Sequence, residues 1–171
     1  MKQYVIIVAG GKGSRMGADV PKQFIELNGK AIILHTLEKY SQALPNAVLV
    51  LVLPEGEISR WGKIAKGTAY EGLTIAKGGE SRFHSVKSGL SVIQEDSIVA
   101  IHDSVRPFVS VETIHNVFKS AEENGTAIPT VDLKESIRKV DGESSVAERR
   151  EHYKLVQTPQ CFNSKLLLKA Y

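Results

Sequence analysis

The sequence predicts an α/β domain in which helices flank a mainly parallel sheet. Apolar runs of strand length alternate with segments of helical periodicity along most of the 171 residues. The run at 47–53 (AVLVLVL) is apolar at every position, which is typical of strands buried on both faces of a parallel sheet. Three of the strands are followed by glycine-rich or charged loops, and parallel sheets bind ligands beyond the carboxyl ends of their strands.

The first half of the chain supplies five elements. A short β-branched run predicts a strand at 4–8, which leads into a glycine-rich loop. Apolar residues at helical spacing predict a helix at 31–43. The strand at 47–53 ends at a proline, and weaker patterns predict a helix at 55–66 and a strand at 73–76.

The second half begins with a helix at 82–94, whose expected apolar face includes Phe83, and a strand at 97–101. A further helix at 111–123 is closed by Asn124 and Gly125, a favourable C-terminal pair. The alternation then weakens, which leaves the rest of the chain less regular.

A strand is predicted at 126–131, and a β-arm excursion near 135–150 folds around a turn at Asp141 and Gly142. The last strand is predicted at 153–156 and the last helix at 163–171. The whole chain, 1–171, is therefore predicted to form a single domain.

The composition excludes several classes of function. The net charge is +3, but basic and acidic residues are interspersed, so we expect no nucleic-acid partner. No apolar run is long enough to cross a membrane, and Met1 to Gln3 leads directly into the first strand, so we expect a cytoplasmic location. The single cysteine, Cys161, excludes an internal disulfide and a cysteine-based zinc site. The five histidines lack ligand spacing and are predicted to be structural or at the surface.

The glycine-rich loop after the first strand is the strongest functional signal. Backbone N–H groups at Gly10, Gly11 and Gly13 can cradle phosphate oxygens. The pattern is neither a dinucleotide fingerprint nor a Walker A loop, because its spacing fits neither. G-x-G-S-R-M-G followed by P-K resembles the signature loop of nucleotidyltransferases. Attack on an α-phosphorus concentrates negative charge, so we expect Arg15 and Lys22 to be catalytic cations.

Two further loops are expected at the same edge of the sheet. In the second, Gly79, Glu80 and Ser85 offer backbone and polar groups that suit the edge of a base. In the third, Asp103 follows a buried strand and is the expected Mg²⁺ ligand, since Mg²⁺ takes one or two carboxylates plus substrate phosphates. Arg106 either binds the phosphate of a second substrate or structures this loop.

Four motifs, in the order VAGGKGSRMG…PKQF, GGESRFHSV, HDSVRPF and LVQTPQCF, span nearly the whole chain. Together they resemble the 2-C-methyl-D-erythritol 4-phosphate cytidylyltransferase family. The resemblance implies a Rossmann-like nucleotidyltransferase sheet and transfer of CMP from CTP to methylerythritol phosphate with Mg²⁺, releasing pyrophosphate, in isoprenoid precursor synthesis.

The resemblance also implies roles for individual residues. Arg15 and Lys22 match the catalytic cations, and Asp103 matches the metal position. The positions around the nucleotide are Ala9, Gly10, Gly79, Glu80, Ser85 and Thr158, and those tied to methylerythritol phosphate are Arg106, Ser136 and Arg150. The family is dimeric, with an exchanged arm that carries the residue matching Arg150 into the partner's site.

Family members continue past the position of Tyr171, so the resemblance implies that part of the C-terminal fold is missing and that the 171-residue form has weak or no activity. Two other interpretations remain. The loops are also similar to those of ribitol-5-phosphate cytidylyltransferases, and a nucleotide-binding fragment without catalysis would share the first loop.

Overall fold

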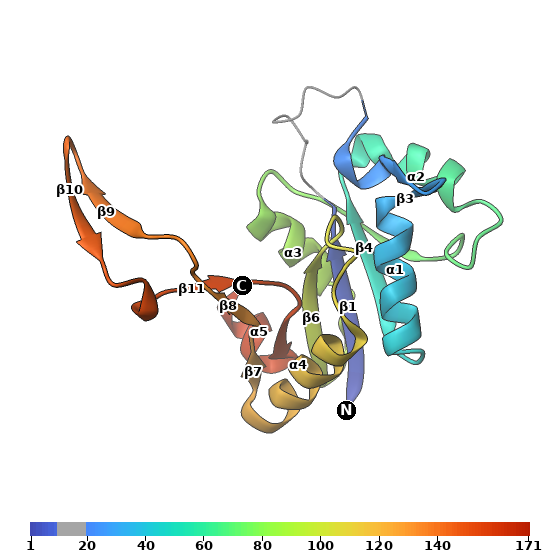
Figure 1. The fold of residues 1–171 in the computed structure, drawn as a ribbon. Helices are drawn as coiled ribbons and strands as arrows, with labels where there is room; N and C mark the ends of the chain where they lie inside the picture. The colour runs from blue at the N-terminus through green and yellow to red at the C-terminus, as the bar shows by residue number, and fades with distance from the viewer. Residues whose placement is uncertain (10–19) are drawn as a thin grey trace.

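A six-stranded sheet in the order β5-β4-β1-β6-β12-β7 forms the centre of the computed structural model, which describes residues 1–9 and 20–171 (Figure 1). Neighbours among β5, β4, β1 and β6 are parallel, whereas β12 is antiparallel to both β6 and β7. The mainly parallel α/β fold is thus confirmed. The strands are β1 (Lys2–Val8), β4 (Val48–Leu53), β5 (Thr74–Lys77), β6 (Ser97–Asp103), β7 (Thr126–Ala127) and β12 (Gln160–Asn163).

Helices cover both faces of this sheet. One core cluster joins the sheet to α1 (Ile32–Ala43), α2 (Ile58–Ala65) and α4 (Val111–Asn124). The other joins it to α3 (Arg82–Leu90) and α5 (Ser164–Ala170). Because successive side chains of a strand point to opposite faces, a strand between two helical layers needs apolar residues at every position. Among the described residues, no helix has the length and apolar character needed to cross a bilayer.

The predicted β-arm is present and projects from the body of the molecule (Figure 1). It is an antiparallel hairpin of β9 (Ile137–Asp141) and β10 (Ser144–Glu148). At its base, β8 (Thr130–Asp132) pairs antiparallel with β11 (Lys154–Val156) in a separate two-stranded sheet. All six residues of this basal pair are exposed.

Some predicted boundaries were wrong. The strand expected at 126–131 is divided around Ile128 and Pro129, so that β7 lies in the central sheet and β8 in the arm base. The helix expected at 82–94 ends at Leu90, after which Ile93 N–H bonds the Leu90 carbonyl in a turn. Phe83, expected on its apolar face, is 46% exposed and stacks on Tyr171.

Two short elements were not predicted. No strand was predicted at the position of β12, although it pairs with β6 over four residues. A small hairpin of β2 (Glu26–Leu27) and β3 (Lys30–Ala31) turns through Asn28 and Gly29, both with positive φ. An Asn-Gly pair is the typical sequence of such a two-residue turn.

At Gly89, α3 packs closely on the sheet. A Cβ at this position would lie 2.6 Å from Ile6 Cγ2 and 3.0 Å from Val52 Cγ2. We expect Gly89→Ala to lower the free energy of unfolding by about 1–2 kcal/mol, because overpacking outweighs the gain in helix propensity. Urea denaturation measures the change.

Gly62, in the interior of α2, is the matched control, since a Cβ there meets nothing within 4 Å. Gly62→Ala should raise the free energy of unfolding by about 0.5–1 kcal/mol. Equal changes in the two variants would contradict the close packing of α3.

Candidate active site

Three strand ends converge at the carboxyl edge of the sheet. Ala9 N–H donates to the Val52 carbonyl at 2.9 Å, Gly78 N–H to the Leu53 carbonyl at 2.7 Å, and Ser104 N–H to the Val8 carbonyl at 3.0 Å. These bonds place the starts of all three expected site loops side by side. β4 and β6 lie on opposite sides of β1, which makes this edge a topological switch point, the usual position of a ligand crevice in such sheets.

The Asp103 carboxylate lies between two arginines at this edge. Arg106 Nε donates to its Oδ2 at 3.0 Å, and Arg82 Nη2 lies 3.4 Å from its Oδ1. The Asp103 side chain is 29% exposed, and those of Arg82 and Arg106 are 49% and 44% exposed. Two guanidinium groups around one carboxylate leave a net positive charge, which favours a phosphate ligand. No individual role was predicted for Arg82 from the sequence.

The third loop is held by His102 and Thr158. Arg106 Nη1 donates to Gln157 Oε1 at 2.7 Å, which joins the loop to the segment before Thr158. His102 Nε2 donates to the Arg106 carbonyl at 3.1 Å, and Thr158 Oγ1 lies 3.0 Å from His102 Nδ1. Thr158, predicted near the nucleotide, is thus brought next to Asp103, whose N–H lies 3.4 Å from Thr158 Oγ1.

His102 is fully buried, as expected of a structural histidine. Burial lowers its pKa from 6.5 to about 4, against the opposing effect of the hydrogen bond to the Arg106 backbone. The ring packs edge-on against Tyr40, with centroids 4.9 Å apart. A neutral imidazole therefore lies beneath the charged loop.

The second loop, at 78–81, is held by a hydrogen bond to Ser85 of α3. Ser85, 1% exposed, accepts a hydrogen bond from Gly79 N–H at 3.1 Å. A Cβ on Gly79 would lie 2.4 Å from His84 Cβ, so packing against α3 requires glycine there. Glu80 is exposed at the edge. Packing thus accounts for Gly79, and the base contacts of Gly79, Glu80 and Ser85 remain predictions.

Lys22 is anchored by its neighbours at the same edge. It begins the 3₁₀ helix Lys22–Phe24 after Pro21, and the buried Gln23 donates from Nε2 to the Ala9 carbonyl at 3.1 Å. This bond ties the Lys22 segment to the end of β1. Gly10, Gly11, Gly13 and Arg15 lie outside the described residues, and their expected roles remain predictions.

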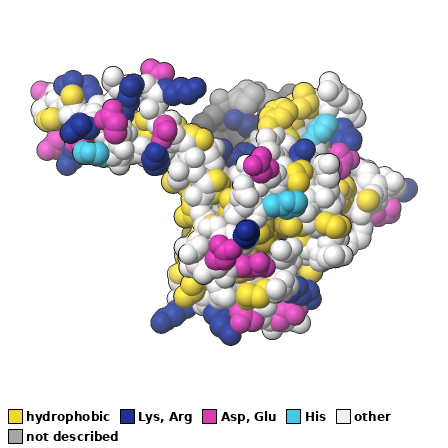
Figure 2. Space-filling model, turned by 60° about the horizontal axis from the view of Figure 1, so that its bottom comes forward, with side chains coloured by type: hydrophobic (Ala, Val, Ile, Leu, Met, Phe, Trp, Pro, Cys, Tyr) yellow, Lys and Arg dark blue, Asp and Glu magenta, His cyan; other side chains and the backbone are white. Residues whose placement is uncertain are grey.

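Ser136 and Arg150 are not brought to this cluster within one chain. Both belong to the arm segment, which extends away from the sheet edge (Figure 1). Arg150 is exposed, donates to the Lys134 carbonyl and lies 3.7 Å from Glu151 Oε1. Basic and acidic side chains are interspersed along the arm (Figure 2).

The carboxylate chemistry at the edge fits magnesium. Among residues 1–9 and 20–171, no three metal-binding side chains cluster, and Asp103 is a single partly exposed carboxylate. Mg²⁺ is commonly bound by one carboxylate together with substrate phosphates. The Mg²⁺ site at Asp103 remains a prediction.

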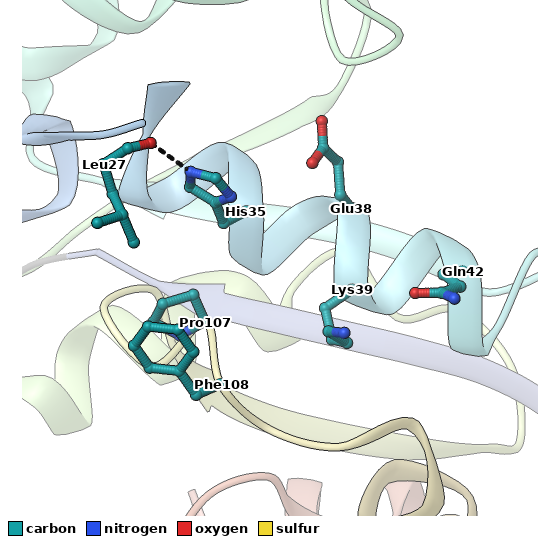
Figure 3. Close-up of a pocket in the computed structure, with 7 residues that line it drawn as sticks. All are labelled: Leu27, His35, Glu38, Lys39, Gln42, Pro107 and Phe108. Atoms are coloured by element: carbon teal, nitrogen blue, oxygen red, sulfur yellow. Dashed lines mark hydrogen bonds between the residues drawn. The ribbon is translucent and has the colours of Figure 1, made fainter. Parts of the chain in front are cut away.

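A separate cavity lies between α1 and the segment that follows Arg106 (Figure 3). His35 Nε2 donates to the Leu27 carbonyl at 2.9 Å at one end of it. None of the predicted site residues lines this cavity, so it is distinct from the Asp103 edge. Its lining residues are Leu27, His35, Glu38, Lys39, Gln42, Pro107 and Phe108.

Comparison with known sequences points to one family. The family model described as 2-C-methyl-D-erythritol 4-phosphate cytidylyltransferase (IspD) matches residues 3–171. A cytidylyltransferase of that name from Bacteroides thetaiotaomicron is 46% identical over 173 residues, covering 100% of this chain and 78% of the relative. One from Clostridium botulinum is 41% identical and covers 95% of this chain and 74% of the relative.

Solved structures of the same family are similar to this chain in fold. The 4-diphosphocytidyl-2C-methyl-D-erythritol synthase from Anaerococcus prevotii superposes with a TM-score of 0.83 at 25% identity, over 98% of this chain and 72% of that one. The cytidylyltransferase from Francisella tularensis gives a TM-score of 0.80 at 30% identity, over 99% and 76%. The similarity therefore extends over nearly all of the present chain.

The buried His102 predicts a pH dependence of stability. Between pH 6.5 and about 4 the unfolded chain binds a proton at His102 that the folded chain does not. The free energy of unfolding should therefore fall as the pH is lowered through this window, by about 3 kcal/mol from this residue alone. Urea denaturation across the pH range, in metal-free buffer, measures the loss.

Other groups titrate in the same window, so the readout is the difference between wild type and His102→Gln. The variant should lack this share of the acid destabilisation. Parallel curves for the two proteins would show that His102 does not titrate with a depressed pKa.

Proposed function

The chain belongs to the 2-C-methyl-D-erythritol 4-phosphate cytidylyltransferase family, and we propose that it transfers CMP from CTP to 2-C-methyl-D-erythritol 4-phosphate, releasing pyrophosphate. The structural observation that carries the proposal is the convergence at one sheet edge of Ala9, the Gly78–Gly79 loop and the arginine-flanked Asp103. Such an edge can hold a nucleoside triphosphate and a second phosphate together.

The reaction needs charge stabilisation more than proton transfer. An oxygen of the acceptor phosphate forms a bond to the α-phosphorus of CTP, and the bond to the bridging oxygen breaks as pyrophosphate leaves with the electron pair. The attacking phosphate is already ionised, so no strong general base is required. Fixed cations lower the barrier by stabilising the charge that develops on the α-phosphoryl group and the leaving pyrophosphate.

Each charged residue at the edge has a separate proposed role in this charge stabilisation. Lys22, and Arg15 from the first loop, would neutralise the triphosphate, and Arg106 would receive the acceptor's phosphate. Asp103 would hold Mg²⁺, which supplies further neutralisation of the phosphate oxygens when bound. Arg106 and Arg82 now contact the Asp103 carboxylate, so both guanidinium groups lie within reach of phosphates bound beside it.

The two alternative functions receive less support. The relatives described above are methylerythritol phosphate enzymes, and none carries a ribitol phosphate name. A fragment that binds nucleotide without catalysis would have no need of an arginine-flanked Asp103 at the phosphate edge. A cytoplasmic location remains a prediction.

We also propose a homodimer with exchanged arms. The basal pair β8–β11 presents exposed apolar side chains, with Val131 48%, Leu155 51% and Val156 54% exposed. Ser136 and Arg150, which the resemblance ties to the acceptor, belong to the arm segment, which projects from the body of the molecule (Figure 1). A second copy related by two-fold symmetry would cover the apolar pair and receive the arm.

Lys22→Ala tests the proposed chemistry. We expect pyrophosphate release from CTP, Mg²⁺ and methylerythritol phosphate to fall by about 10²–10³-fold, because a cation aimed at developing charge is removed. Lys39→Ala, in the cavity away from the edge, is the control and should leave the rate unchanged. Faster turnover with ribitol 5-phosphate than with methylerythritol phosphate would contradict the assigned acceptor.

Mixing two inactive variants tests arm exchange. If the arm serves the partner's site, a heterodimer of Lys22→Ala and Arg150→Ala chains contains one intact site. Random association should then restore about a quarter of the wild-type activity. If the mixture stays as inactive as its components while the chains are dimeric by light scattering, each arm serves its own site.

A further inference from the structure

The buried ring of His102 joins two segments that are distant in sequence. One ring nitrogen contacts the backbone of Arg106, and the other contacts Thr158, 56 residues further along the chain. We propose that His102 is a positioning residue for the reaction, setting Arg106 and the Asp103–Thr158 pair at a fixed separation. The inference rests on the proposed function.

The directions of these hydrogen bonds follow from their partners. A carbonyl oxygen only accepts, so Nε2 carries the proton that bonds the Arg106 carbonyl at 3.1 Å. In the neutral ring Nδ1 is then an acceptor, and the Thr158 hydroxyl donates to it at 3.0 Å. The Thr158 oxygen keeps a lone pair toward Asp103 N–H, 3.4 Å away. One ordered chain of hydrogen bonds therefore runs from Asp103 through Thr158 and His102 to Arg106.

The surroundings keep the ring in this orientation. His102 has no exposed surface and packs against the Tyr40 ring of α1. From the same helix, the buried Thr36 donates to the Ser104 carbonyl at 2.7 Å, so the loop is also held on the α1 side. A packed ring with both nitrogens bonded has no alternative rotamer that satisfies both partners.

The two bonds control different parts of the site. The Nε2 bond holds the backbone of Arg106, whose guanidinium is proposed to receive the acceptor phosphate. The Nδ1 bond orients Thr158, which contacts the backbone of Asp103 on the nucleotide and metal side. Loss of one bond should therefore affect the binding of one substrate more than that of the other.

Two conservative variants separate the bonds. An asparagine amide lies at the Nδ1 position, and a glutamine amide reaches the Nε2 position. We expect His102→Asn to raise KM for methylerythritol phosphate about tenfold with KM for CTP nearly unchanged, and His102→Gln to do the reverse. Thr158→Val should cost less in the His102→Gln background than in the wild type, since the bond between the two side chains is already absent there.

His115 provides the matched control. Its Nε2 also donates to a backbone carbonyl, that of Ala43 at 2.8 Å, but it joins α4 to α1 away from the edge. His115→Gln and His115→Asn should leave both KM values unchanged. Thermal unfolding of each variant identifies effects that come only from lost stability.

The proposal is overturned if both His102 variants raise the two KM values by the same factor, or if neither value changes. A wild type that neither binds CTP nor turns over would instead refute the proposed function. Wherever turnover is absent, NMR decides: His102→Asn should shift the Arg106 Nε resonance and spare the Thr158 methyl, and His102→Gln should do the opposite. Equal shifts at both positions in both variants would reject the positioning role.

Discussion

The structure depends on the hydrogen bonding of β1 to parallel strands on both of its sides. β1 is in register with β4 and β6, so that Val8 is level with both Val52 and Asp103. Residues 4–8 are buried, and their side chains pack alternately against the helices on the two faces of the sheet. Packing therefore holds β1 between the helical layers, and hydrogen bonding sets its register. Because parallel strands end at the same edge, this one constraint brings together loops that are separated by most of the chain.

The electrostatics of that edge follow from the same constraint. Asp103 ends β6 on the face that packs against α3, so Arg82 at the start of α3 approaches it from one side and Arg106 from its own loop. These are partly exposed ion pairs, which contribute little to stability. If a cation and a nucleotide bind here as proposed, they would replace these ion pairs at small cost, and the arginines would become available to phosphate.

Periodicity and loop chemistry predicted most of the fold, and packing determined what they missed. β12 has only four residues, and pairing with β6 alone makes it a strand. The division of 126–131 depends on which sheet each half joins, and no local pattern encodes that choice. Asp103 and Lys22 were predicted from sequence because their residue types suit phosphate chemistry, and Gly79 because bare backbone suits the edge of a base. Their roles remain predictions. The contact of Arg82 with Asp103 was not predicted, because it joins the start of α3 to the end of β6, which are distant in sequence. The hydrogen bonds of His102 were not predicted either, because they depend on its burial, which the sequence does not show.

The arm exposes apolar side chains that a partner chain could cover. A two-stranded hairpin is marginally stable in water unless a third strand or a packed layer supports it. Here Val140 and Val146 are 71% and 65% exposed, and the cross-strand support is polar, with Arg138 donating to the hydroxyl and carbonyl oxygens of Ser145. The basal pair beneath is equally open, with no third strand beside it among the described residues. The described residues give this arm little apolar support, and in the proposed dimer a second copy would supply it. The proposed dimer would thus account both for the open β8–β11 pair and for the projection of the arm from the body (Figure 1).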